Sequence, residues 1–113
     1  MAIAAKRLLG DRIRRGLIVG VLPAGTPSVD GLPFPMIVGG HPTPTAESER
    51  GGREALQLAA SLQPDETLLV LLSGGASALM AVPAEGLTLA DKQATTQQLL
   101  RAGADIHALN TVR

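Results

Sequence analysis

A short stretch with the sequence SGGAS has the residue types of an anion-binding loop, and we call it the glycine loop. It follows an apolar run typical of a buried strand and precedes residues that favour a helix. Gly74 and Gly75 allow a sharp turn and a close approach of a ligand to the backbone. Ala76 and Ser77 would open the helix, whose first turn carries unpaired N–H groups and a partial positive charge. Together these features favour phosphate or another anion, with Ser73 and Ser77 as hydroxyl donors; a tight turn without a ligand is the alternative.

The glycine loop matches none of the common nucleotide or nucleophile motifs. It is not the P-loop, GxxxxGK[ST], and it is not the dinucleotide-binding GxGxxG. A nucleophile elbow, GxSxG, needs a glycine two residues after the serine, but Ser77 is followed by Ala78 and Leu79. The stretch therefore predicts an anion site without specifying which phosphate or carboxylate it holds.

A second stretch, Gly39–Thr45 (GGHPTPT), follows another expected strand, and we call it the histidine loop. Because the carboxyl ends of parallel strands meet at one edge of a sheet, we expect it to lie at the same edge as the glycine loop. His41 could donate a hydrogen bond to an anion or act as a general acid or base. A surface histidine in a proline-rich turn is the alternative interpretation.

Polar residues near the end of the sequence are further candidates. Asn110, Thr111 and Arg113 lie close together, and arginine is the natural partner of a carboxylate or phosphate. A solvated helix end explains the same pattern, and His107 is expected on a helix surface. No pair of carboxylates has a spacing typical of acid–base catalysis or metal binding, so the metal ligands are unknown.

Composition excludes several classes of function. The 113 residues carry 10 basic and 10 acidic side chains, and this balance argues against a general nucleic-acid binder. Phe34 is the single aromatic residue, so stacking on bases is excluded as well. The absence of cysteine excludes disulfides and thiolate chemistry. No stretch reaches the roughly 18 apolar residues of a membrane-spanning helix, and we expect a soluble, cytoplasmic protein.

Strands and helices alternate along the chain in a pattern typical of an α/β fold. Apolar runs predict strands at 16–22, 36–38 and 67–72, and helical periodicity predicts helices at 2–9, 46–62, from 76, at 88–102 and at 106–113. Strands separated by helices imply parallel pairing in a layered fold. We call the last strand, Thr67–Leu72, the apolar segment, and because it is apolar throughout we expect it to be covered on both faces.

Local signals refine the expected helices. Gly51 and Gly52 lie inside the helix at 46–62, where each costs about 1 kcal/mol relative to alanine. They either weaken that prediction or mark a close packing contact. Thr88 and Asp91 have the spacing of a capping box, and Asp105 is placed to cap the last helix.

Longer motifs resemble those of a known family. The sequence from GGHPTPTAES through LLVLLSGGASALMAVPAEGLTLADKQATTQQLLRAGADIHALNTVR resembles the class II glycerate kinases, which are glycerate 2-kinases with a C-terminal MOFRL domain, some formerly labelled hydroxypyruvate reductases. Members carry a GHPxPD-like segment, an SGGGSAL loop, a P-x-x-G-[IV]-[TS]-L-x-D-K segment and LLxxGAxIxExNxVRKHLS. The resemblance covers nearly the whole chain. It implies part of a three-layer α/β/α Rossmann-like domain with a mainly parallel sheet.

The resemblance also implies a set of binding residues. The glycine loop and the histidine loop would line a cleft between two domains, where glycerate and the nucleotide phosphates meet. The residues carried over as substrate-binding or phosphate-binding are Ser73, Gly74, Gly75, Ala76, Ser77, His41, Asn110 and Arg113.

The sequence departs from the family pattern at several positions. Ala76 stands at the third loop glycine, where alanine is acceptable only without a positive φ, and Thr45 replaces the usual aspartate. The GKA motif with the family's lysine would lie just upstream of the helix at 2–9, and Lys6 does not match it. Residues 1–113 also lack the KHLS continuation, the KGG segment and the MOFRL domain. We therefore expect a fragment of the N-terminal domain that is inactive alone.

The function that the resemblance implies is ATP-dependent phosphorylation of D-glycerate to 2-phosphoglycerate, with Mg²⁺ or another divalent cation. The partners would be D-glycerate, ATP and the missing C-terminal domain, with a homo-oligomer left open and no nucleic acid or membrane. One alternative is a hydroxypyruvate reductase that uses a nicotinamide cofactor, but the sequence has no GxGxxG and no suitably placed ribose-binding acid. Another is a non-catalytic anion-binding or partner-binding module, whose exposed apolar surface would favour dimers or aggregates.

Overall fold

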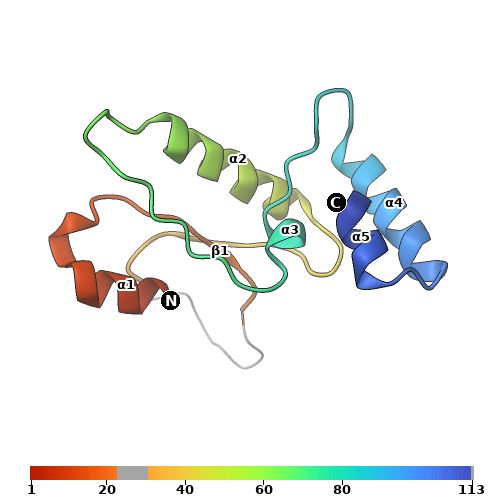
Figure 1. Ribbon diagram of the computed structural model, residues 1–113, viewed down its shortest axis with the longest axis horizontal. Coiled ribbons are helices and arrows are strands. Elements are labelled where there is room, and N and C mark those ends of the chain that lie inside the picture. Colours follow the sequence, from red (N-terminus) through yellow and green to blue (C-terminus); the bar gives the residue numbers. More distant parts are fainter. Residues whose placement is uncertain (23–30, 113) are drawn as a thin grey trace.

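The computed structural model describes residues 1–22 and 31–112 (Figure 1). Its elements follow in the order α1 (Ala2–Leu9), η1 (Gly10–Arg12), β1 (Ile18–Gly20), β2 (Met36–Val38), α2 (Ala46–Ala60), α3 (Ala76–Leu79), α4 (Leu89–Arg101) and α5 (Ile106–Val112). All the predicted helices form, and two of the three predicted strands do. Most of the loop expected at 23–33 lies outside the described residues.

The strands β1 and β2 form a parallel two-stranded sheet in which Val19 lies opposite Ile37. The pairing continues past β2, because Gly39 N donates to Gly20 O at 2.9 Å. The predicted α/β class with parallel pairing is therefore confirmed. The same bond ties the start of the histidine loop to the end of β1.

Helix α2 packs closely through two glycines, Gly51 against the sheet and Gly52 against the residues that follow α3. A Cβ added to Gly51 would lie 2.9 Å from Val19 Cγ1, and one added to Gly52 would lie 2.5 Å from Val82 Cγ2. Both distances are well below the 3.5–4.0 Å of ordinary carbon contacts. The glycines therefore mark a close packing contact, which was one of the two interpretations of their place inside a helix.

The apolar segment does not form the covered strand that its sequence predicts. It connects the end of α2 to α3 without regular secondary structure (Figure 1). No backbone hydrogen bond joins it to any residue in the described part of the chain. Its side chains are exposed rather than buried, from 43% for Leu68 to 67% for Leu72. An apolar run indicates that a segment prefers to be a buried strand, but it does not show that a neighbouring strand or helix is present. No described element pairs with the apolar segment or covers it.

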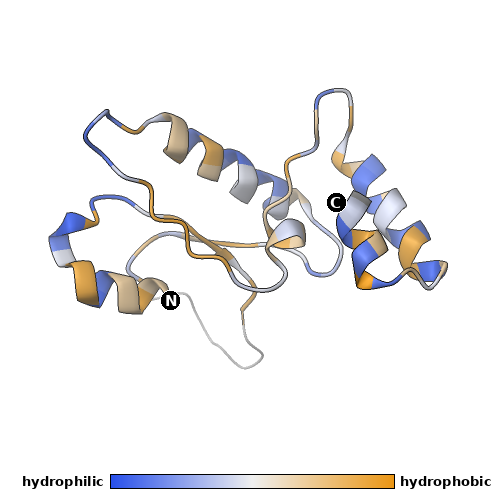
Figure 2. Ribbon diagram, viewed as in Figure 1, coloured by the Kyte–Doolittle hydropathy of each residue, from blue (hydrophilic) through white to orange (hydrophobic). Residues whose placement is uncertain are grey.

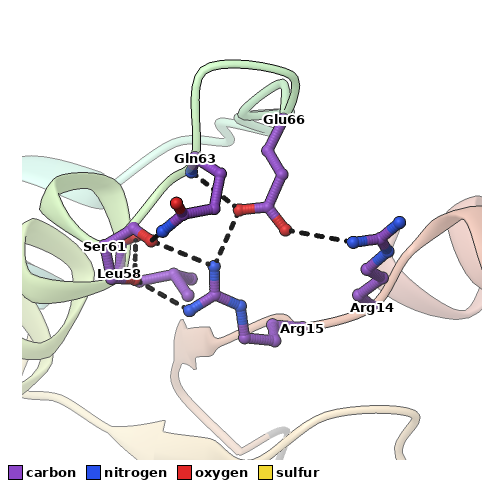
Figure 3. Close-up of polar contacts among 6 residues, drawn as sticks. All are labelled: Arg14, Arg15, Leu58, Ser61, Gln63 and Glu66. Carbon is purple, nitrogen blue, oxygen red and sulfur yellow. Dashed lines mark hydrogen bonds and ion pairs between the residues drawn. The ribbon is translucent and has the colours of Figure 1, made fainter.

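A polar cluster fixes the start of the apolar segment, and we call it the Glu66 cluster (Figure 3). Arg15 donates to Ser61 Oγ at 2.8 Å and to Glu66 Oε2 at 3.1 Å, while Arg14 Nη1 lies 3.7 Å from Glu66 Oε1. Gln63 N also donates to Glu66 Oε2, at 2.9 Å. This N–H, and then the charges of Arg15 and Arg14, hold the pKa of Glu66 below its ordinary value against the opposing effect of desolvation. The cluster joins the chain before β1 to the end of α2.

The C-terminal helices begin at the caps that the sequence predicts. Thr88 N donates to Asp91 Oδ2 at 2.8 Å and Asp91 N donates to Thr88 Oγ1 at 3.1 Å, which completes the capping box of α4. The Thr88 hydroxyl and amide lower the pKa of Asp91. At α5, Ala108 N donates to Asp105 Oδ1 at 2.8 Å. Both cap predictions are confirmed.

The core is small and aliphatic. Its buried hydrophobic residues within the described ranges are Ile37, Ala78, Leu79, Ala81 and Leu109. They come from β2, α3 and the turn after it, and α5. Figure 2 shows that hydrophobic residues continue along the apolar segment, outside this core. Among the described residues, no helix is both long and apolar enough to cross a membrane.

Candidate functional site

The glycine loop leads from the end of the apolar segment into α3 (Figure 1). Gly75 has φ +84° and ψ −1°, a left-handed conformation that residues with a side chain rarely adopt. Gly74 is exposed, and a Cβ added to it would meet no atom within 4 Å. Ala76 is the first residue of α3 and has no positive φ. Alanine therefore fits the position at which the resembled family has its third loop glycine.

The hydrogen-bond donors of the glycine loop are available to a ligand. Ser73 and Ser77 are exposed, and neither hydroxyl has a hydrogen-bond partner among residues 1–22 and 31–112. Gly75 O accepts bonds from Ala78 N and Leu79 N, both at 3.1 Å, which closes the first turn of α3. The N–H groups at the start of α3 precede these two bonded amides in the chain. They have no acceptor within the helix and can donate to an acceptor outside it, as at any helix start. This arrangement suits a small anion.

His41 lies directly against the glycine loop. A Cβ added to Gly75 would lie 2.8 Å from His41 Cδ2 and 3.1 Å from His41 Nε2. Gly75 is therefore required both by its backbone conformation and by the imidazole beside it. His41 is exposed, so its ring can reach a molecule bound at the glycine loop. The structure brings the two predicted loops together, although only the histidine loop follows a strand.

Two residues outside the predicted site, Ser48 and Gln93, hold the histidine loop in place. Ser48 Oγ accepts hydrogen bonds from Gly40 N at 2.9 Å and from Thr45 N at 3.1 Å. Gln93 Nε2, from α4, donates to Pro44 O at 2.8 Å. The spacing of Thr45 and Ser48 is that of a capping pair and could have indicated the first contact. Nothing in the sequence indicates the second, because it joins segments far apart in the chain.

The other predicted binding residues are not joined to these loops. Asn110 lies on α5 and is exposed, and no hydrogen bond within the described residues links it to either loop. Arg113 lies outside the described residues. Within the described ranges, no group of three or more His, Asp or Glu residues could hold a metal ion.

The whole chain matches one family model. The family described as "Domain of unknown function (DUF4147)" matches residues 1–113. The chain belongs to this DUF4147 family. The match includes both loops, so the site described above is part of the DUF4147 domain.

Known proteins similar to this DUF4147 chain carry names of glycerate metabolism. A D-glycerate 2-kinase of Thermotoga maritima is 39% identical over 113 residues, which is 100% of this chain and 27% of the relative. The crystal structure of a glycerate kinase from Thermotoga maritima superimposes with a TM-score of 0.79 and 38% identity, over 98% of this chain and 26% of that one. A putative hydroxypyruvate reductase of Agrobacterium vitis is 40% identical over 69% of this chain and 20% of the relative. The chain thus spans about a quarter of the length of these relatives.

Proposed function

We propose that residues 1–113 form part of the N-terminal domain of an ATP-dependent glycerate kinase that converts D-glycerate to 2-phosphoglycerate. The observation that carries this proposal is the similarity to a D-glycerate 2-kinase over the full length of the chain, at 39% identity. The site geometry agrees with it, because a loop with open N–H and hydroxyl donors lies against a histidine. The product, 2-phosphoglycerate rather than 3-phosphoglycerate, follows the name of that relative.

In the proposed reaction, a hydroxyl oxygen of D-glycerate attacks the γ-phosphorus of ATP, the bond from that phosphorus to the ADP oxygen breaks, and the hydroxyl proton is released. Phosphoryl transfer needs little covalent help from the protein, and it depends on positioning and on stabilising negative charge. The glycine loop would hold an anion, either a phosphate of the nucleotide or the glycerate carboxylate, through the Ser73 and Ser77 hydroxyls and the first amides of α3. His41 would donate a further hydrogen bond to it.

Other parts of the site belong to the proposal without a contact in the described residues. Asn110 and Arg113 would orient the same anion from α5 and the residue after it. The lysine of the family motif and a divalent cation would act from outside residues 1–113, which alone would be inactive. The exposed apolar segment would pack against the rest of the longer protein. A cytoplasmic location suits this reaction and a chain without cysteine.

Hydroxypyruvate reductase is the second candidate, because one of the relatives carries that putative name. The sequence gives it little support, because no GxGxxG follows a strand. We therefore favour the kinase.

A paired assay on the complete protein tests this choice. One arm measures ADP formation from ATP and D-glycerate, and the other measures NADH or NADPH oxidation with hydroxypyruvate. We expect ADP formation, a large decrease in the His41→Gln variant, and no change in the matched variant of the exposed His107 on α5, His107→Gln. Nicotinamide oxidation without ADP formation would refute the kinase assignment.

A further inference from the structure

Ser48 is the most completely buried polar side chain among the described residues, with 0% of its surface exposed. It lies in the first turn of α2, directly after the histidine loop. A buried hydroxyl is stable only when its hydrogen bonds are made. The partners of Ser48 therefore show which parts of the fold it serves.

The Ser48 hydroxyl has a full set of partners. Its oxygen accepts from Gly40 N at 2.9 Å and from Thr45 N at 3.1 Å. It also lies 3.4 Å from Thr45 Oγ1, to which it can give its proton, because a hydroxyl has one donor and two acceptor positions. Thr45 Oγ1 in turn accepts from Ser48 N at 3.4 Å. One side chain thus closes both ends of the histidine loop onto α2.

The backbone of Ser48 reaches the other half of the site. Ser48 O accepts from Ala81 N at 3.2 Å, just after α3. Gly40 is the neighbour of His41, and α3 begins immediately after Gly75. The Ser48 hydroxyl therefore holds the backbone beside His41. The Ser48 carbonyl holds the residue just after α3, which is the helix that the glycine loop enters.

We infer that Ser48 is a positioning residue that sets the separation of His41 from the glycine loop. This inference rests on the proposed function, because it assigns Ser48 to the site that would bind the phosphate or glycerate carboxylate. Ser48 touches no substrate and acts through Gly40. Without its hydroxyl, the Gly40 and Thr45 amides lose the acceptor of their partly buried hydrogen bonds, and the histidine loop moves to regain one.

Two variants of Ser48 and one control test the inference in the complete protein. Ser48→Ala removes the acceptor. Ser48→Cys fills the space of the hydroxyl with a somewhat larger thiol that is only a weak acceptor, so it serves if the alanine variant does not fold. The control is Thr45→Ala, which removes the hydroxyl that caps α2 but leaves Ser48 Oγ bonded to Gly40 N.

The first readout is the nuclear Overhauser effect between His41 Hδ2 and Gly75 Hα, measured with selectively labelled histidine and glycine. One Hα of Gly75 points where a Cβ would lie, 2.8 Å from His41 Cδ2, so the signal is strong in the native geometry. We expect it to weaken or vanish in both Ser48 variants and to persist in Thr45→Ala. If Ser48 only stabilised the fold, the His41–Gly75 signal would have the same strength in the folded Ser48 variants as in Thr45→Ala.

The second readout is kcat/KM for ADP formation. A displacement of about 1 Å costs on the order of 100-fold in rate, so we expect a decrease of that size for Ser48→Ala and a much smaller one for Thr45→Ala. If the native protein forms no ADP, the proposed function fails, yet the His41–Gly75 signal still tests the positioning. An unchanged signal and unchanged kcat/KM in a folded Ser48 variant would overturn the inference.

Discussion

Replacing Gly75 by alanine should damage the site far more than replacing its neighbour Gly74. Gly75 has φ +84°, where a side chain costs roughly 1–2 kcal/mol. Its new Cβ would also lie 2.8 Å from His41 Cδ2. Because His41 is exposed, its ring can swing away, so this contact adds displacement rather than much strain. We expect Gly75→Ala to lower the free energy of unfolding by about 1–2 kcal/mol.

The same substitution should lower activity by more than its effect on stability suggests. Pushing the imidazole aside by about 1 Å would decrease kcat/KM on the order of 100-fold if His41 contacts the bound anion. Gly74→Ala is the matched control for stability, because its φ is not positive and its Cβ would meet no atom within 4 Å. A surface change of this kind should stay within about 0.5 kcal/mol.

Denaturant unfolding and the ADP-formation assay on the complete protein check both numbers. The decisive comparison is of the unfolding free energies of the two alanine variants. Activity is measured under conditions in which both variants are folded. If Gly75→Ala and Gly74→Ala have the same unfolding free energy, and Gly75→Ala keeps the kcat/KM of the native protein, then neither the left-handed backbone nor the contact with His41 matters, and this site geometry is wrong.

Three further predictions concern the fold. Thr88→Ala should destabilise the protein by about 1 kcal/mol in denaturant unfolding, because Asp91 N loses its acceptor; Thr88→Ser should have little effect, and an equal loss in both variants would contradict the role of the hydroxyl. Gly52→Ala should cost about 1–3 kcal/mol by the same measurement, since its Cβ would lie 2.5 Å from Val82 Cγ2, and a neutral effect would show that α2 can shift without cost. The lowered pKa of Glu66 means that the unfolded chain takes up its proton first, so this carboxylate stabilises the fold above its ordinary pKa of 4.5 and the contribution fades as the pH falls further. The midpoint of thermal unfolding should therefore fall with pH in this range less steeply in Glu66→Gln than in the native protein, and identical slopes would exclude the effect.

Local signals in the sequence were reliable where a few adjacent residues decide the structure. The capping pair of Thr88 and Asp91 and the cap at Asp105 formed as their spacing predicts, because a cap is satisfied within one turn of helix. The predicted approach of His41 to Gly75 is also observed, but it does not come from two loops that follow parallel strands, because the apolar segment before the glycine loop forms no strand.

Features that depend on distant partners could not be predicted. The contact of Arg15 with Glu66 joins residues 51 positions apart, and both are ordinary surface residue types. Ser48 looks like any serine near a helix start until its burial is known. The apolar segment was expected to be covered, but composition says only that a strand prefers a neighbour and not where that neighbour comes from.

The exposed apolar segment has a consequence for handling the chain. A run of leucine and valine with unpaired backbone groups can add to another copy of itself, edge to edge, and so begin a cross-β aggregate. Natural sequences place charged gatekeepers beside such runs, and Asp65 and Glu66 precede this one. Glu66 also anchors the segment through Arg15. Because the pKa of Glu66 is lowered, only acid below its ordinary value of 4.5 would release this anchor, so residues 1–113 are best purified well above that value.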